Sequence, residues 1–102
     1  MSMKVLDKVE LNVNVEIPPD YALVLWNDDE NEFFSICRTI MDGASVSEAD
    51  AMNITMTAHH EGKAVIGMFP YEICEAMQDS IVEAGPKYGA ETIKVTIEEV
   101  DE

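Results

Sequence analysis

Six consecutive polar residues, Asn27 to Glu32, carry the side chains of this sequence whose types and spacing could do chemistry. They comprise four carboxylates and two amides, and they lie between the apolar run 21–26 and two phenylalanines, Phe33 and Phe34. Carboxylate and amide oxygens accept hydrogen bonds, and a bond to a charged donor such as an ammonium is stronger than a neutral one. The segment therefore suggests a site for a ligand with a positive end, although Asp and Asn also occur in turns and helix caps for structural reasons alone.

A calcium loop is the first alternative, because Asn27, Asp29 and Asn31 would occupy positions 1, 3 and 5 of an EF-hand. The sixth position of such a loop needs Gly and the twelfth needs Glu, whereas this sequence has Glu32 and Arg38 there. The pattern excludes an EF-hand.

Zinc and catalysis are the next alternatives. His59 and His60 are adjacent, so on a helix their side chains point about 100° apart and cannot share one ion. No G-x-S-x-G motif is present, and neither Cys37 nor Cys74 lies in a catalytic motif. We therefore expect a binding protein rather than an enzyme, with no metal and no cofactor.

The formal net charge of −15, from 21 acidic and 6 basic residues, limits the possible partners. A strongly acidic surface repels phosphate backbones and anionic lipid, so we expect neither a nucleic acid nor a membrane partner. No apolar stretch approaches the roughly 20 residues that span a bilayer, and the N-terminus lacks a signal-peptide pattern. Both cysteines lie among apolar neighbours and are expected to be small buried side chains in a reducing cytoplasm.

The chain of 102 residues is long enough for one domain, preceded by a segment of a different kind. Apolar residues alternate with polar ones from Val9 to Ile17, which is the period of a strand, and Pro18-Pro19 separates them from the next apolar run. This segment could be an edge strand, but terminal segments are commonly mobile unless they dock. We predict a mobile N-terminal arm over residues 1–18 and a folded core over residues 19–102.

The elements of the core are predicted from apolar periodicity and from capping residues. The run 21–26 is short and apolar on both faces, as in a central strand, and strands are also predicted at 63–69 and 93–97. Asp29 and Glu32 resemble a capping box for a helix that Gly43 closes, and Ser45 or Ser47 could cap a second helix that ends at Gly62. A third helix is predicted from Pro70 to Gly85-Pro86.

The resulting order is β-α-α-β-α-β. It contains too few strands and helices, and too uneven an alternation of them, for a doubly wound sheet. The economical packing is an α+β fold, in which a three-stranded, mainly antiparallel sheet is packed on three helices.

Two stretches of this core resemble the ClpS family, the N-degron adaptors of Clp AAA+ proteases. The first is Y-A-L-V-L-W-N-D-D, an apolar strand that ends in N-D-D, and the second contains H-x-x-G-K-A at His59 to Ala64. Their separation also resembles the family pattern, and the similarity covers about 80% of the chain, from Tyr21 into the last strand. The resemblance implies a ClpS-like fold and an adaptor that binds proteins by a bulky hydrophobic N-terminal residue.

The resemblance also implies roles for individual residues. Asn27, Asp29 and His59 would hold the α-amino group of the substrate, and Asp28 would reach the peptide backbone just beyond. The first side chain of the substrate would enter a hydrophobic pocket lined by Leu25, Phe33, Ile36, Thr55, Ala58 and Ile93. Three of these positions depart from the family, which usually has Met, Met and Val where this chain has Phe33, Thr55 and Ala58.

The implied partners are substrate proteins with bulky hydrophobic N-terminal residues and a Clp-family AAA+ unfoldase of the ClpA or ClpC kind. Glu72 matches an acid that the family uses to dock on the unfoldase, whereas Met77 stands where the family usually has Lys. A cytoplasmic monomer is expected. The alternative is a domain of the same fold that modulates a Clp unfoldase, without catalysis and without reading N-termini.

Overall fold

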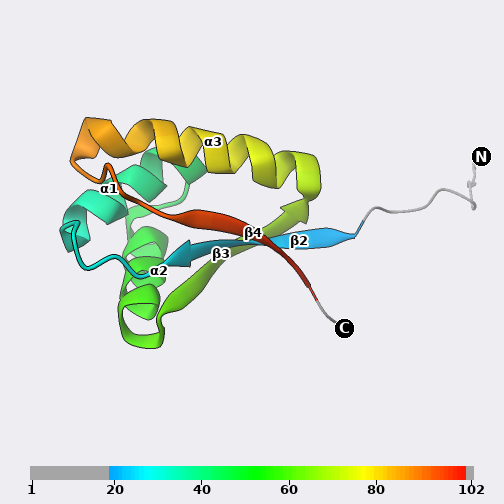
Figure 1. Ribbon diagram of the computed structural model, residues 1–102, viewed down its shortest axis with the longest axis horizontal. Helices are drawn as coiled ribbons and strands as arrows, with labels where there is room; N and C mark the ends of the chain where they lie inside the picture. Colours follow the sequence, from blue (N-terminus) through cyan, green and yellow to red (C-terminus); the bar gives the residue numbers. More distant parts are fainter. Residues whose placement is uncertain (1–18, 101–102) are drawn as a thin grey trace, which may run out of the picture.

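The computed structural model describes residues 19–100, which form three strands and three helices. In chain order these are β2 (Asp20–Trp26), α1 (Phe33–Ala44), α2 (Glu48–Glu61), β3 (Lys63–Pro70), α3 (Tyr71–Tyr88) and β4 (Val95–Glu99) (Figure 1). The predicted order β-α-α-β-α-β is confirmed. The predicted N-terminal arm, residues 1–18, lies outside the described residues.

The strands form one sheet in the order β3-β2-β4, with both neighbouring pairs antiparallel. The predicted α+β fold with a three-stranded antiparallel sheet is therefore confirmed. As the central strand, β2 buries four consecutive residues, Ala22 to Leu25, which explains why the sequence there is apolar at every position.

The strand β3 contains a bulge opposite the centre of β2. Leu23 pairs with Gly67 and Val24 pairs with Val65, so Ile66 is the extra residue. A Cβ on Gly67 would lie 2.6 Å from the ring of Phe69, so the absence of a side chain at Gly67 lets an aromatic side chain of the same strand pack over it.

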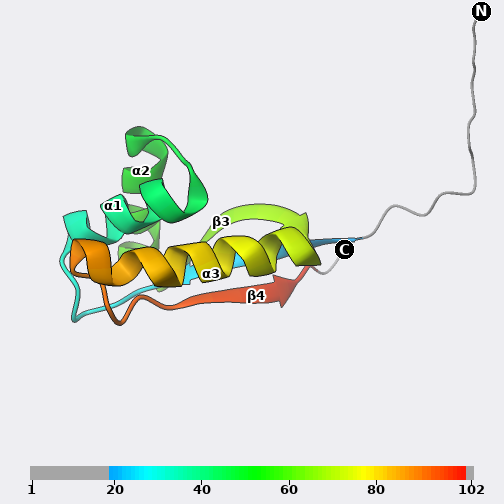
Figure 2. The same ribbon diagram turned by 90° about the horizontal axis from the view of Figure 1, so that it is seen from above.

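All three helices lie on one side of the sheet. The long helix α3 runs along the sheet and contacts all three strands, α1 packs against α3, and α2 packs against α1 and β3 (Figures 1 and 2). Among residues 19–100, no helix is long and apolar enough to cross a membrane.

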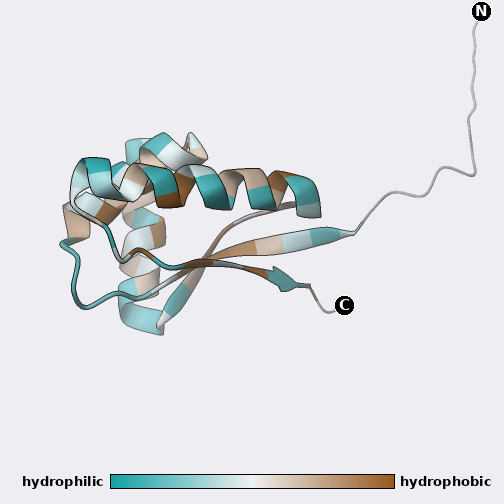
Figure 3. Cartoon of the chain, turned by 45° about the horizontal axis from the view of Figure 1, so that its top comes forward, coloured by the Kyte–Doolittle hydropathy of each residue, from teal (hydrophilic) through white to brown (hydrophobic). Residues whose placement is uncertain are grey.

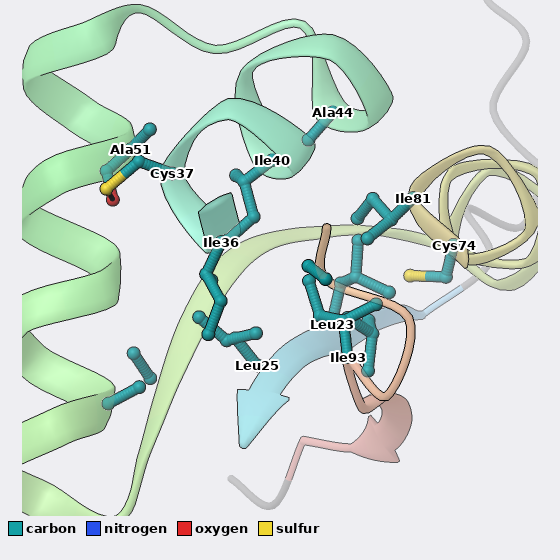
Figure 4. Packing of buried hydrophobic residues seen from close by; sticks show 14 residues of the cluster. Leu23, Leu25, Ile36, Cys37, Ile40, Ala44, Ala51, Cys74, Ile81 and Ile93 are labelled. Atoms are coloured by element: carbon teal, nitrogen blue, oxygen red, sulfur yellow. Dashed lines mark hydrogen bonds between the residues drawn. The ribbon is translucent and has the colours of Figure 1, made fainter. Parts of the chain in front are cut away.

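The core fills the space between the sheet and the helices. Leu23 and Leu25 point from β2 toward Ile36 and Ile40 of α1 and Ile81 of α3 (Figure 4). Both cysteines are free and buried, as predicted from their apolar neighbours. The middle of β2 is hydrophobic in Figure 3, whereas the link from β2 to α1 is hydrophilic, so the polar segment 27–32 lies at the border of the core.

Two helix termini differ from the sequence prediction. The capping box is wrong, because α1 begins at Phe33 after an N-cap at Glu32 that makes no side-chain capping bond. The third helix does not end at Gly85-Pro86 but continues to Tyr88, and Gly89 caps it in the left-handed conformation with φ 81°. A proline in the last turn is tolerated here because it removes only one helical hydrogen bond, and its ring is exposed.

Three further expectations are refined by the structure. The glycine that was expected to close α1, Gly43, is inside the helix and packs directly against Ile81 of α3, and the left-handed residue after the helix is Ser45. Ser47 caps α2, where its hydroxyl oxygen accepts from the Asp50 N–H at 3.1 Å. Ile93 precedes β4, which begins at Val95.

Candidate functional site

A cavity of about 500 Å³ opens where the end of β2, the start of α1 and the second half of α2 meet. The cavity combines polar groups from the link after β2 with apolar groups from the strand and both helices. Nine of the residues that the sequence analysis assigned to a binding site line it: Leu25, Asn27, Asp28, Asp29, Phe33, Ile36, Thr55, Ala58 and His59.

Gly62 explains why the two sequence motifs meet at this cavity. It ends α2 in the left-handed conformation, with φ 95°, and its N–H donates to the Ala58 carbonyl at 2.9 Å. The Gly62 carbonyl accepts from the Asn27 N–H, also at 2.9 Å. The end of the helix that carries His59 is thereby joined to the first residue of the polar segment.

Asn27 and Asp29 are exposed and lie next to each other on the rim of the cavity. The Asn27 side-chain amide donates from Nδ2 to Oδ1 of Asp29 at 3.3 Å. Within the part of the chain that the structure describes, this contact leaves the amide oxygen of Asn27 and the second carboxylate oxygen of Asp29 free to accept other hydrogen bonds. His59, exposed on α2, adds an imidazole to the same rim.

Asp28 is bound in a different way from its neighbours. Its Oδ1 accepts from the backbone N–H groups of Glu30, at 2.8 Å, and Asn31, at 3.3 Å. Its Oδ2 accepts from the Asn31 side-chain amide and from the Thr92 hydroxyl, the latter at 3.0 Å. Burial alone would raise the pKa of Asp28, but the hydrogen bonds from Glu30, Thr92 and Asn31 outweigh it and hold the pKa below its ordinary value.

The inner walls of the cavity are apolar. Leu25, Ile36 and Ala58 are all buried, and Phe33, half-buried in the first turn of α1, stands with its ring at 88° to that of Phe34. The hydroxyl of the buried Thr55 donates to the Ala51 carbonyl at 2.7 Å, so its donor is already used within α2. The wall at Thr55 is therefore less polar than its residue type suggests.

The comparisons with known proteins agree with one another. The model of the family described as ATP-dependent Clp protease adaptor protein ClpS matches residues 16–96. The chain belongs to the ClpS family. It is 34% identical to the ClpS adapter of Nautilia profundicola over 66% of this chain and 69% of that protein. It is 32% identical to the ClpS adapter of Acetivibrio thermocellus over 74% of this chain and 77% of that protein.

A solved structure shares the fold of this ClpS family member. Agrobacterium tumefaciens ClpS2 bound to L-phenylalaninamide superposes with a TM-score of 0.74 at 25% identity, covering 82% of this chain and all of that one. By its family, this protein is a Clp protease adaptor. The description of the family names an adaptor role and no reaction.

Two predicted residues of this ClpS chain lie away from the cavity. Ile93 is buried in the core beside Leu23 (Figure 4) and is not among the lining residues. Glu72, assigned to docking, is exposed in the first turn of α3, close to the exposed Ile73. Met77, in contrast, is half-buried against the core.

Four residues that line the cavity of this ClpS family member were not identified from the sequence: Trp26, Asn31, Met56 and His60. Met56 lies three residues before His59, a spacing that places both on one helix face, so helical periodicity could have identified it. His60 has no sequence signal for this cavity besides its position next to His59. The ring centroids of the two histidines lie 5.5 Å apart, and both residues line the cavity.

Proposed function

We propose that this ClpS family member binds the free α-amino group and the bulky hydrophobic first residue of N-degron substrates, and delivers them to a Clp-family AAA+ unfoldase. The observation that supports this function is an apolar cavity whose rim carries acceptors that no donor among residues 19–100 uses. An α-ammonium offers three donors, and the Asn27 amide oxygen, the Asp29 carboxylate and a nitrogen of the His59 imidazole could accept them. L-Phenylalaninamide, the ligand of Agrobacterium ClpS2, has such an amino group beside an aromatic side chain.

The walls of the cavity favour an aromatic first residue. Thr55 and Ala58 are small, which leaves space for a ring, and Phe33 at the entrance can pack against it edge to face. Peptides that differ only in their first residue, Phe, Tyr, Trp or Leu, would test this preference by fluorescence anisotropy. If the Leu peptide binds most tightly, the proposed preference is wrong.

The central test compares free and acetylated Phe-initiated peptides. Acetylation removes the charge and two donors, so the rim acceptors would lose their partners, and we expect affinity to fall at least about a hundredfold. The double variant Asp28→Ala, Asp29→Ala should lose binding of the free peptide while circular dichroism shows a folded protein. Equal affinity for the two peptides would instead support a non-catalytic modulator that does not read N-termini.

Delivery is proposed to depend on Glu72. Its carboxylate is exposed at the start of α3, about 16 Å along the helix from Glu83, which is also exposed and serves as a matched control. We expect Glu72→Ala to weaken binding to a ClpA- or ClpC-like unfoldase and to leave peptide affinity unchanged. Glu83→Ala should change neither. The same loss in both variants would indicate a general effect of charge.

The monomeric state and the cytoplasmic location also stay predictions. Light scattering of the purified chain and fractionation of cells that express it are the measurements that check them.

A further inference from the structure

Asp28, Asn31 and Thr92 form a hydrogen-bonded cluster that joins the link after β2 to the segment between α3 and β4. The Asn31 amide donates to Thr92 Oγ1 at 2.7 Å, and the Thr92 hydroxyl donates to Asp28 Oδ2 at 3.0 Å. We propose that Asn31 and Thr92 are positioning residues for recognition of the substrate amine: they hold Asp28 so that Asn27 and Asp29 face the bound ammonium. This inference rests on the proposed function.

The hydrogen bonds of Asp28 show why it holds the segment rather than the ligand. A carboxylate has about four acceptor positions, and two protein donors occupy each oxygen of Asp28. An additional donor from a substrate would have to displace one of them. Among residues 19–100, the side chain of Asp29 contacts only Asn27, through Oδ1, and its second oxygen stays available. The two adjacent aspartates therefore have different roles: Asp28 holds the segment in place, and Asp29 binds the ligand amine.

The cluster gives the polar segment a fixed point on the core. Thr92 precedes Ile93, which is buried and donates its N–H to the Ala90 carbonyl at 3.2 Å. Ala90 is itself buried and donates to the Gly85 carbonyl at the end of α3. The segment 27–31 carries three adjacent negative charges, which repel one another, and without this attachment it would spread.

Thr92 is exposed but is not among the residues that line the cavity. Any effect of its hydroxyl on binding must therefore pass through the two residues that it contacts, Asp28 and Asn31, and this makes Thr92 the informative position to change. Thr92→Val keeps the shape of the side chain and removes the hydroxyl, whereas Thr92→Ser keeps the hydroxyl and removes a methyl group.

We expect Thr92→Val to lower affinity for free-amine peptides by about five- to tenfold, the scale of one exposed hydrogen bond to a carboxylate. Thr92→Ser, which keeps the hydroxyl, should bind the same peptides with wild-type affinity. The ratio of affinities for Phe- and Leu-initiated peptides should not change, because the apolar walls are untouched. A Thr92→Val protein that is folded by circular dichroism and binds like wild type would overturn the proposal. So would a changed Phe-to-Leu ratio, or a Thr92→Ser variant as weak as Thr92→Val.

A double-mutant cycle with Asp29 tests the route of the effect. In an Asp29→Asn background the charged acceptor is gone, so Thr92→Val should change affinity by less than about twofold. A full five- to tenfold loss in that background would show that Thr92 does not act through the placement of Asp29. The proposed function fails separately, if the wild-type protein does not prefer free to acetylated peptides.

Discussion

The contact between α1 and α3 at Gly43 makes a sharp prediction about how the cavity is held in shape. A Cβ added at Gly43 would lie 2.5 Å from Cα, 2.7 Å from Cγ1 and 2.8 Å from N of Ile81. Comfortable contacts between carbon atoms need about 3.5–4.0 Å, so Gly43→Ala requires the two helices to separate by about 1 Å. Two of the three atoms belong to the backbone of α3, which cannot turn away as a side chain could.

The magnitude comes from two opposing effects. Alanine is favoured over glycine inside a helix by about 1 kcal/mol. Overpacking a core typically costs about 1–3 kcal/mol, and a clash with backbone belongs at the upper end, about 3 kcal/mol. We therefore expect Gly43→Ala to lower the free energy of unfolding by about 2 kcal/mol, which for a domain of this size corresponds to a Tm about 10 °C lower.

Urea and thermal unfolding followed by circular dichroism measure this change, with Ser80→Ala as the control. Ser80 is exposed on α3 next to Ile81, so its replacement by alanine changes helix propensity without a new contact. Because α1 also carries Phe33 and Ile36, Gly43→Ala should weaken peptide binding as well. A Tm that rises, as expected for an unhindered helical Gly→Ala change, would show that α1 and α3 do not clash at this position.

Three further predictions concern the cavity, the thiol of Cys74 in the core and the carboxylate of Asp28 in the polar segment, whose pKa values are shifted. Thr55→Met should fill part of the cavity and weaken binding of Phe-initiated relative to Leu-initiated peptides by about tenfold, measured by anisotropy. The pKa of the Cys74 thiol is raised by burial, so iodoacetamide at pH 8 should label it only after denaturation; rapid labelling of the native protein would contradict its burial. The pKa of Asp28 is depressed in the folded state, so its hydrogen bonds stabilise the protein above the ordinary value near 3.8, and the stabilisation is lost as the pH falls below that value. The difference in free energy of unfolding between wild type and Thr92→Val should therefore be present at pH 7 and should shrink toward pH 3 in urea titrations; a difference independent of pH would be the contrary result.

The order of the elements could be predicted because α1 and α3 have a helical apolar period and the strands are short apolar runs. The helix α2 has a weak apolar period but is bounded by recognisable capping residues, Ser47 and Gly62. The end of α3 could not be predicted. Gly85-Pro86 has the composition of a helix stop, but Gly85 is there because the Ala90 carbonyl oxygen would lie 2.5 Å from its Cβ. The same ambiguity applies to Gly43, because glycine is found both where two helices approach closely and where a helix ends.

The polar rim of the site was predicted from N-D-D and H-x-x-G-K-A together, through the family resemblance. Local chemistry alone favours a helix cap at Asp29, whereas in the structure Glu32 occupies the N-cap of α1 and the Asp29 carboxylate accepts from Asn27. The contact between Asp28 and Thr92 could not have been predicted, because it joins residues separated by 64 positions and neither residue has a pattern around it.

Trp26, the last residue of the central strand, gives the cavity a built-in optical reporter. It is the only tryptophan in the sequence, and it lies among the lining residues next to Asn27. Its indole N–H donates to the Thr96 hydroxyl at 2.7 Å, and the ammonium groups of Lys63 and Lys94 stand 5.1 and 5.2 Å from the ring centroid. The emission of an indole depends on its hydrogen bond and on nearby charge, so ligand entry can be followed by intrinsic fluorescence, with no dye on either the adaptor or the peptide.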